Sequence, residues 1–261
     1  MSPPSPTEGL TLSTTHLRLR CQPVPWDRQA FGFPVAQLVD LQVGDLRAAA
    51  SDYQTVREWL HDQDIRILSC RLPHDQLRES MFLEDQGLRF VEMVLHPQLS
   101  ALDRLSLPPD SLTITEAGPA DLPALETIAG AAFRHERYHV DPRLDPRLGD
   151  VRYVRWVRNT IGHPLQRLLQ VQDDSRLVAF FIVEVDGEEA YWHLTAVAPE
   201  WQGQGYGRRA WQAMLHRHQC EGAKRICTTI SASNTRVLNL YARLGFGFQP
   251  PSMTFHWVRD A

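Results

Sequence analysis

The first hundred residues alternate between short apolar runs and segments in which apolar side chains recur at helical spacing. This spacing is clearest at Tyr53, Val56, Trp59 and Leu60, which predict a helix over residues 53–63. A second helix is predicted over residues 75–86 and ended by Gly87. The predicted strands are residues 17–20, 35–43, 65–70 and 88–95.

The second half has a similar pattern with clearer turns. Asp173-Asp174-Ser175 and Asp186-Gly187 separate three apolar runs, which predicts two hairpins and antiparallel pairing. The predicted strands are residues 112–116, 166–172, 177–185, 190–197, 225–230 and 254–258. The predicted helices are residues 122–133, 151–161, 208–219 and 235–244. The pattern predicts an α/β fold with a mixed, largely antiparallel sheet flanked by helices.

Turn-forming residues divide the chain into three parts. Residues 1–15, rich in Pro, Ser and Thr, are predicted to be a disordered leader. Residues 97–109 are the best linker candidate, so we expect one domain at 16–108 and a second at 109–261. Residues 82–96 resemble residues 240–257 in pattern: a helix end, a glycine, an aromatic residue and a strand. Either such junctions look alike in general, or the first domain is a shortened copy of the second.

Composition narrows the function classes. With 27 Lys and Arg against 31 Asp and Glu, the formal net charge is −4, which gives no basic field for nucleic acid or an anionic membrane. The apolar run 177–183 is too short to span a membrane, and the N-terminus lacks a secretory-signal pattern, so a cytoplasmic protein is expected. The single lysine, Lys224, precedes an arginine, which excludes a phosphate-binding Gly-Lys-Ser/Thr loop.

The most informative segment is the glycine-rich loop at residues 202–207. It follows the predicted strand 190–197 and leads directly into a helix. Three glycines within five residues allow successive backbone N–H groups to face one point, and the helix N-terminus adds its own N–H groups and positive dipole end. Such a loop suits a diphosphate. It departs from the dinucleotide-binding fingerprint in spacing, and the strand 225–230 ends without the acidic residue expected for a ribose.

Two motifs in this region resemble the Gcn5-related N-acetyltransferase (GNAT) superfamily. The first is Gln/Arg-x-x-Gly-x-Gly/Ala, met by Gln202, Gly205 and Gly207 after a strand that ends in Ala196-Val197. The second is an asparagine followed by a helix that carries a tyrosine before Gly-Phe, met by Asn234, Tyr241, Gly245 and Phe246. The resemblance covers roughly residues 112–258. It implies a GNAT fold there, preceded by a shortened GNAT-like domain.

The resemblance implies acetyl-CoA as co-substrate. The residues expected to contact it are Thr195, Ala196, Val197, Gln202, Gly203, Gln204, Gly205, Tyr206, Gly207, Arg208 and Asn234. Asn234 is also a plausible helix N-cap, and the two roles are compatible. Tyr241 matches the tyrosine that donates a proton to the departing thiolate, because a phenol and a thiol have comparable basicity. A core aromatic beside Leu240 and Leu244 is the alternative for Tyr241.

The base that removes a proton from the amine is less clearly marked. His193 and Glu184 lie on neighbouring predicted strands, and strand alternation places His193 on the same face as Thr195 and Val197. His193 is the candidate base, while a structural hydrogen bond or deprotonation through water are the alternatives. His216, His218 and Cys220 lie two residues apart on a predicted helix, so neighbours in this set face opposite ways and a solvated helix face is expected instead of a metal site.

Two further segments resemble bacterial amino-sugar acetyltransferases of the same superfamily. They are residues 26–33 (WDRQAFGF) and 131–144 (AAFRHERYHVDPRL). In the second, Arg137, Tyr138, His139 and Asp141 combine a guanidinium for phosphate, a ring for stacking and a carboxylate for hydroxyls or ammonium. The resemblance implies that these four residues bind the acceptor. A surface loop whose polar residues face water is the alternative.

The sequence therefore predicts an acetyl-CoA-dependent N-acetyltransferase. A primary amine, on a dTDP- or UDP-linked deoxyamino sugar, is expected to attack the thioester directly. The enzyme alternatives are a protein N-terminus, an amino acid or a small-molecule amine as acceptor, and the alternative of another class is a non-catalytic acyl-CoA sensor. No metal, nucleic acid or membrane partner is expected, and the sequence leaves the oligomeric state open, a homodimer included.

Overall fold

The computed structural model describes residues 8–108 and 110–259, and the chain forms two compact units. Unit 1 comprises the residues up to Met93, residues 140–145 and the residues from Pro251 onward. Unit 2 comprises residues 94–139 and 146–250. Within the described ranges, no helix is both long and apolar enough to cross a membrane.

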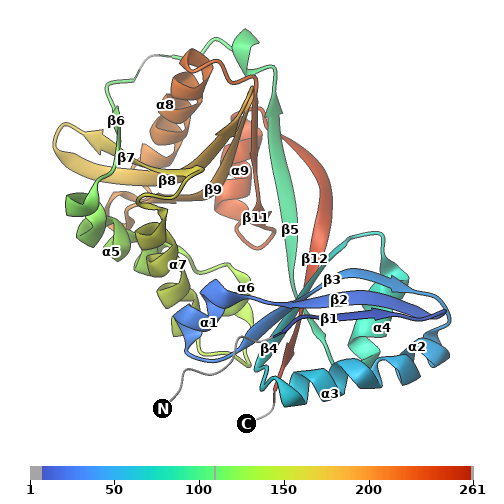
Figure 1. The fold of residues 1–261 in the computed structure, drawn as a ribbon. Coiled ribbons are helices and arrows are strands. Elements are labelled where there is room, and N and C mark those ends of the chain that lie inside the picture. Colours follow the sequence, from blue (N-terminus) through green and yellow to red (C-terminus); the bar gives the residue numbers. More distant parts are fainter. Residues whose placement is uncertain (1–7, 109, 260–261) are drawn as a thin grey trace. The chain divides into compact units, whose positions relative to one another are not determined.

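Unit 1 is a five-stranded mixed sheet with helices between its strands (Figure 1). Its strands are β1 (Leu10–Ser13), β2 (Leu17–Pro23), β3 (Val35–Val43), β4 (Ile67–Pro73) and the end of β12 (Gly247–Val258). Its helices are α1 (Pro25–Phe31), α2 (Leu46–Asp52), α3 (Gln54–Asp62) and α4 (Leu77–Asp85). β3 and β4 are parallel, and the other neighbouring pairs are antiparallel.

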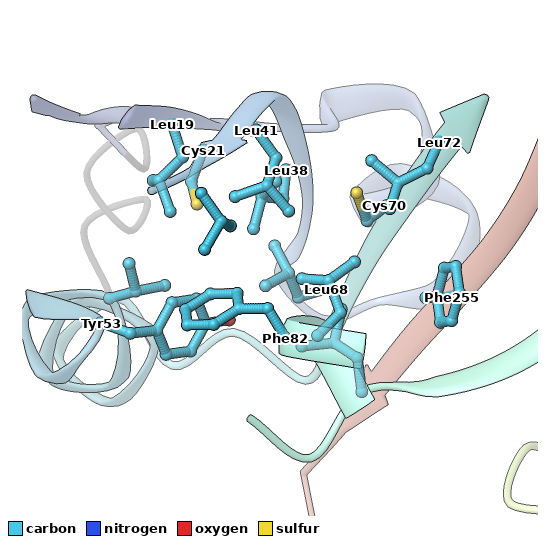
Figure 2. Packing of buried hydrophobic residues seen from close by; sticks show 14 of the residues in the cluster. Leu19, Cys21, Leu38, Leu41, Tyr53, Leu68, Cys70, Leu72, Phe82 and Phe255 are labelled. Atoms are coloured by element: carbon cyan, nitrogen blue, oxygen red, sulfur yellow. The ribbon is translucent and has the colours of Figure 1, made fainter. Parts of the chain in front are cut away.

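The core of unit 1 forms where α3 and α4 cover the sheet. Tyr53 and Phe82 pack edge to face, with ring centroids 5.6 Å apart, beneath the strand residues Cys21, Leu38 and Leu68 (Figure 2). Leu38 pairs with Cys21 on one side and Cys70 on the other, so the three side chains share one face. This continuous apolar layer explains the hydrophobic positions seen in the sequence.

The strands of unit 2 lie in the order β6-β7-β8-β9-β10-β5. Its strands are β5 (Arg89–Ser100), β6 (Thr113–Glu116), β7 (Gln166–Asp173), β8 (Arg176–Asp186), β9 (Glu189–Val197), β10 (Arg225–Thr228) and β11 (Ile230–Ser231), which pairs with β5. Its helices are α5 (Leu122–Ala132), α6 (Arg137–Val140), α7 (Arg147–Thr160), α8 (Tyr206–Cys220) and α9 (Thr235–Arg243). Three short 3₁₀ turns lie at Leu102–Arg104, Pro119–Asp121 and Pro199–Trp201. Among the pairings of these strands within the described residues, only that of β9 with β10 is parallel.

Helices cover both faces of the unit 2 sheet. α5 and α7 pack on one face through Leu125, Val157 and the strand residues Leu194 and Ala196. α8 and α9 pack on the other through Trp211, Tyr241 and Trp192, among others. The expected α/β fold with a largely antiparallel sheet flanked by helices is confirmed.

The two units repeat one succession of elements: antiparallel strands, a crossover helical segment, a parallel strand, another helix and a long strand. β3 forms four parallel pairs with β4, and β9 forms four with β10. Each of these strands then carries one extra residue relative to its antiparallel neighbour, near Asp40 in β3 and at His193 in β9. Gly87 and Gly245 take positive φ angles of 91° and 87° at the matching helix ends. These correspondences favour an internal repeat over a chance likeness of junctions.

Several boundaries differ from those expected. Residues Leu10–Ser13, predicted to be disordered, form β1 and pair with β2, while residues 1–7 of the predicted leader and residue 109 lie outside the described residues. The segment expected to be a linker is partly strand, because residues 98–100 of β5 pair with β10. The contact-based division accordingly falls between Met93 and Val94, not near residue 108. Asp45 caps α2, so the first helical segment begins before residue 53.

Candidate active site

A β-bulge in β9 sets the geometry of the site. Ile182 pairs with Leu194 and Val183 pairs with Trp192, which leaves His193 as an extra residue. His193 and Leu194 therefore lie on the α5/α7 face, where the His193 ring centroid is 6.1 Å from that of Trp156, whereas Thr195 lies on the α8/α9 face. The expectation that His193 shares a face with Thr195 was wrong, because strand alternation shifts by one residue at the bulge.

Beyond the bulge, one edge of β9 is left without a strand partner. The parallel pairing with β10 ends at Trp192 and Thr228, and β11 pairs with β5 instead of β9. On the other edge, the Ala198 N–H donates to the Val178 carbonyl at 2.9 Å. Antiparallel alternation then directs the backbone groups of Ala196 to β8 and those of Thr195 and Val197 to the free edge. Such an edge can pair with an extended ligand.

The loop 202–207 has backbone donors available. Gly203 and Gly205 adopt φ angles of 80° and 87°, which favour glycine, and a Cβ at either position would meet nothing within 4 Å. Across the described residues, the N–H groups of residues 203–207 donate to no protein acceptor. They lie at the N-terminus of α8, where the helix dipole favours an anion. The exposed Arg208 in the first turn of α8 has no ion-pair partner in the same described ranges.

The two glutamine side chains of the loop bond within their own segment. Gln202 Nε2 donates to the Val197 carbonyl at 3.2 Å, and Gln204 Nε2 donates to the Glu200 carbonyl at 2.7 Å. These bonds tie the loop to the end of β9. The Tyr206 hydroxyl donates to Asp173 at 2.6 Å and so bonds to the β7–β8 hairpin.

Tyr241 brings its hydroxyl to the bulged strand from α9. Its side chain is 1% exposed, and its hydroxyl lies beside Trp211, Thr195 and Thr228. Burial raises the pKa of Tyr241, an effect that these polar neighbours reduce. Tyr241 is therefore a neutral phenol that can donate a proton near the free edge of β9.

Asn234 caps α9. Its side-chain oxygen accepts a hydrogen bond from the Val237 N–H at 3.3 Å, which confirms the N-cap interpretation. The cap fixes the first turn of the helix that carries Tyr241. The expected contact of Asn234 with acetyl-CoA stays a prediction.

His193 and Glu184 form a hydrogen-bonded pair on the α5/α7 face. His193 Nε2 lies 3.0 Å from Glu184 Oε2, and both side chains are partly exposed, at 21% and 33%. The rings of Tyr191 and Trp156 flank the imidazole, with centroids 4.7 Å and 6.1 Å away. A histidine oriented by a carboxylate, with its other nitrogen available, can accept a proton.

The four residues expected at the acceptor are not gathered on one surface. Tyr138 is 1% exposed, and the His139 side chain is 2% exposed, bonds Asp150 at 3.0 Å and stacks on Tyr153. The Arg137 guanidinium lies 4.8 Å from the centroid of the Tyr138 ring.

Asp141 belongs to unit 1, whereas Arg137, Tyr138 and His139 belong to unit 2. The Asp141 side chain is 1% exposed and bonds His256 Nδ1 at 3.0 Å and Arg143 at 2.8 Å. Both bonds lower the pKa of Asp141 against the opposing effect of burial. The burial and pairing of these side chains show that they stabilise local structure. A pattern of polar residues in the sequence does not reveal this role.

The His216–Cys220 segment also differs from expectation in one residue. His218 is completely buried against Trp192, with ring centroids 6.1 Å apart, so it does not belong to a solvated face. Cys220 and His216 are exposed neighbours, with Sγ 3.9 Å from Nε2. In the portion of the chain described, no three His, Cys, Asp or Glu side chains are grouped as metal ligands.

Sequence reasoning missed two contributors to the site. Trp156 lies in the helix predicted over residues 151–161 and was given no role in the site, yet its ring lies 6.1 Å from that of His193. Asp173 was interpreted only as part of a turn, yet it bonds both Tyr206 and Arg209. Aspartate is common in turns, so the sequence does not reveal that Asp173 also bonds residues of α8. No local sequence signal marks the bulge that brings His193 close to Trp156.

Side chains bond the backbone around the corresponding junction of unit 1. At the end of β3, the Val43 N–H donates to Glu79 and the Gly44 carbonyl accepts from Arg78. At the start of α2, the Asp45 carboxylate accepts from the Ala48 N–H at 2.9 Å. This junction therefore differs from the glycine loop of unit 2, which is the part of the chain that holds the candidate site.

Comparisons with known proteins agree with this placement. Residues 126–246 match the model of the acetyltransferase (GNAT) family. The chain is 32% identical over 78 residues to the [ribosomal protein bS18]-alanine N-acetyltransferase of Salmonella typhimurium, covering 30% of this chain and 53% of the relative. The chain thus spans about half the length of the curated relatives it matches.

Two solved structures are similar over most of the chain. A functionally unknown conserved protein from Staphylococcus epidermidis has a TM-score of 0.67 at 13% identity, covering 98% of this chain and 96% of its own. A GCN5-related N-acetyltransferase from Sphaerobacter thermophilus has a TM-score of 0.64 at 14% identity, covering 92% and 76%. At these identities the likeness shows the fold. The segment 126–246, which holds the bulged strand, the glycine loop and Tyr241, is the part of the chain that matches the acetyltransferase (GNAT) family model.

Proposed function

We propose that this protein is an acetyl-CoA-dependent N-acetyltransferase with its catalytic site in unit 2. The observation that carries the proposal is the coincidence of a free strand edge at Thr195–Val197 with unpaired loop N–H groups at the N-terminus of α8. A free strand edge suits the amide-containing pantetheine arm, and the loop suits the diphosphate of the same molecule. The fit therefore concerns two chemically different parts of one co-substrate.

The proposed reaction is a direct transfer. With Nε2 of His193 bonded to Glu184, Nδ1 is the nitrogen that accepts a proton from the acceptor ammonium. The amine nitrogen then forms a bond with the thioester carbonyl carbon, and the Thr195 N–H stabilises the developing oxyanion. When the carbon–sulfur bond breaks, Tyr241 gives its proton to the thiolate. The second proton, which the nitrogen loses as the amide forms, passes to solvent, and solvent reprotonates Tyr241. His193 and Tyr241 lie on opposite faces of the sheet, which suits an amine that enters on one side and a thiol that leaves on the other.

For the acceptor we propose a nucleotide-linked deoxyamino sugar. The support is the resemblance of residues 26–33 and 131–144 to bacterial amino-sugar acetyltransferases such as the dTDP-4-amino-4,6-dideoxygalactose N-acetyltransferase. Arg137 is the member of the predicted acceptor set that keeps partial exposure together with a positive charge.

A protein N-terminus is the second candidate acceptor. It is favoured by the curated relatives, which are named for acetylating an alanine of ribosomal protein bS18. A non-catalytic acyl-CoA sensor is the alternative from another class. The amino-sugar and protein N-terminus proposals predict release of CoA thiol with different amines. The sensor proposal predicts that no thiol is released.

The decisive assay measures release of free CoA thiol from acetyl-CoA with a panel of amines. The panel contains dTDP- and UDP-linked amino sugars, a peptide with an N-terminal alanine, and free amino acids. We expect release with an amino sugar. Release with the alanyl peptide alone would replace the acceptor proposal and keep the activity. Binding of acetyl-CoA without release for any amine would leave the sensor.

A further inference from the structure

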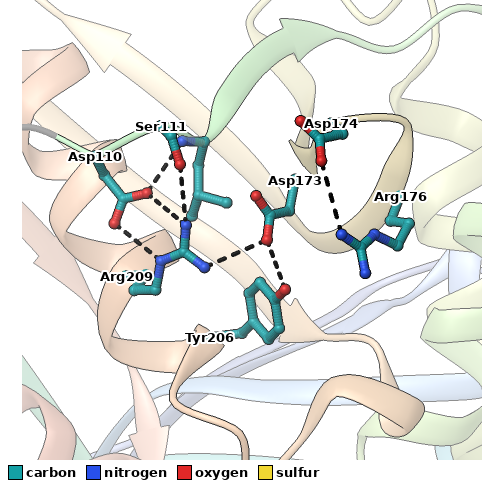
Figure 3. Close-up of polar contacts among 8 residues, drawn as sticks. Asp110, Ser111, Asp173, Asp174, Arg176, Tyr206 and Arg209 are labelled. Carbon is teal, nitrogen blue, oxygen red and sulfur yellow. Dashed lines mark hydrogen bonds and ion pairs between the residues drawn. The ribbon is translucent and has the colours of Figure 1, made fainter.

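The glycine loop is held at both ends by one hairpin that lies outside it. The hairpin joins β7 to β8 through residues 174 and 175, with Asp174 at a φ angle of 55°. At the far end of the loop, Asp173 accepts from the Tyr206 hydroxyl at 2.6 Å (Figure 3). At the near end, the Arg176 guanidinium lies 5.6 Å from the centroid of the Trp201 ring. Trp201 and Tyr206 themselves pack edge to face, with centroids 5.6 Å apart.

A second charged contact fixes the first turn of α8. Arg209 bonds Asp110 at 2.9 Å and Asp173 at 3.4 Å, and its guanidinium lies 5.1 Å from the centroid of the Tyr206 ring (Figure 3). Asp173 therefore receives bonds from two residues of the same helical turn. The hydrogen bond from Tyr206 lowers the pKa of Asp173 below its usual range, with a further contribution from Arg209.

The neighbouring arginine behaves differently. Arg208 is exposed and, in the part of the chain that the structure describes, forms no ion pair, whereas Arg209 is bound by two carboxylates. Because Arg209 pairs with two carboxylates, its positive charge is not available to a ligand. Arg208 is left as the charge available to a phosphate.

The loop's own hydrogen bonds come from the side chains of Gln202 and Gln204, so contacts from outside can order its backbone further. Two glycines adopt left-handed conformations, and the N–H groups of residues 203–207 bond to no protein acceptor in the described ranges. A loop of this kind loses conformational entropy when it closes on a ligand unless something else has already ordered it. The side chains of Tyr206 and Trp201 contact the β7–β8 hairpin, and these contacts can order the loop.

We propose that the side chains of Asp173, Tyr206 and Arg209 are positioning groups, which pre-order the loop for the diphosphate of CoA without themselves contacting it. This inference rests on the proposed function. It predicts that the hairpin sets affinity for the co-substrate and leaves the chemical step unchanged. Asp173 and Tyr206 act as one unit, because each is the hydrogen-bond partner of the other.

The test is calorimetric titration of acetyl-CoA with wild type, Asp173→Asn, Tyr206→Phe and the double variant. We expect each single change to raise the Kd for acetyl-CoA about tenfold, and the double change to raise it little further. The matched control is Asp186→Asn, a carboxylate at the start of the opposite hairpin, which should bind as wild type does. A thermal unfolding midpoint close to that of wild type verifies that each variant is folded.

A second readout separates positioning from a general structural loss. S-Acetylpantetheine carries the thioester and the pantetheine arm but not the diphosphate. We expect kcat/KM with acetyl-CoA to fall about tenfold in Asp173→Asn, and kcat/KM with S-acetylpantetheine to stay at the wild-type value. Unchanged acetyl-CoA affinity in both single variants, or equal losses with the two thioesters, would overturn the positioning role. Absence of acetyl-CoA binding to the wild type would overturn the proposed function and this inference with it.

Discussion

Tyr241 combines a buried ring with a hydroxyl beside the bulged strand. Burial keeps the phenol protonated at neutral pH, and the neighbouring Thr195 places that proton close to the free edge of β9. These properties suit a general acid, whereas a core aromatic requires only the ring. The distinction can be tested by removing the oxygen and keeping the ring.

We expect Tyr241→Phe to lower kcat about a hundredfold, because general acid catalysis typically contributes at least that factor. The Kd for acetyl-CoA should stay within about twofold of wild type, since the phenol acts on the leaving thiolate. Steady-state kinetics and calorimetry measure the two quantities. The matched control is Tyr53→Phe, which removes a buried hydroxyl in the core of unit 1 and should leave kcat unchanged. A wild-type kcat in Tyr241→Phe would remove Tyr241 from the mechanism.

The sequence predicts the residue types at the candidate site more readily than the direction in which each side chain points. The motif residues Gln202, Gly205 and Tyr241 all belong to unit 2, and their roles at the site stay predictions. His193 could not be oriented in advance, because a one-residue bulge reverses its face and depends on pairing with β8. Asp141 could not be recognised as structural, because its partner His256 lies 115 residues later in the chain.

At the scale of elements, α8 serves two purposes. Its N-terminus offers N–H groups to an anion, and its C-terminal half places His218 in the core beside Trp192. Burial lowers the pKa of His218 to about 4, although the nearby Glu221 opposes the shift. A histidine forced to be neutral in the folded state couples the stability of this helix to pH.

The direction of this pH dependence follows from the two protonation states. Below about pH 6.5 the unfolded chain protonates His218 while the folded chain does not, so stability is fully present above that pH and is lost as pH falls toward 4. We expect wild type to lose about 3 kcal/mol more than His218→Gln between pH 7 and pH 4. Urea unfolding at several pH values measures the difference. Parallel stability curves for the two proteins would contradict the buried neutral histidine.

At the scale of the whole molecule, the last strand of each half of the sequence pairs with a strand from the other half. β5 follows the strands of unit 1 in sequence but pairs with β10 of unit 2, and β12 follows the strands of unit 2 but pairs with β4 of unit 1. The element types were predictable from hydrophobic periodicity. The exchange of strands could not be predicted in this way. Hydrophobic periodicity and turn residues are local signals, whereas a strand pairs with partners that lie far away in the sequence.

Deleting residues 251–261 tests this exchange. The deletion removes the strand next to β4, whose residues Ile67, Leu68, Cys70 and Leu72 are buried, and leaves the paired strands of unit 2 in place. We expect the amides of β3 and β4 to lose protection from hydrogen exchange. The Kd for acetyl-CoA should change by less than about threefold, a factor worth under 1 kcal/mol. Retained protection in β4 would show that unit 1 does not depend on this strand.

The central claim concerns where acetyl-CoA binds, and a crystal structure of the protein with CoA tests it most directly. The account predicts that the diphosphate lies within hydrogen-bonding distance of the N–H groups of residues 203–207, with the pantetheine arm along the free edge at Thr195–Val197. CoA bound elsewhere on the protein, with those N–H groups directed away from it, would contradict the account.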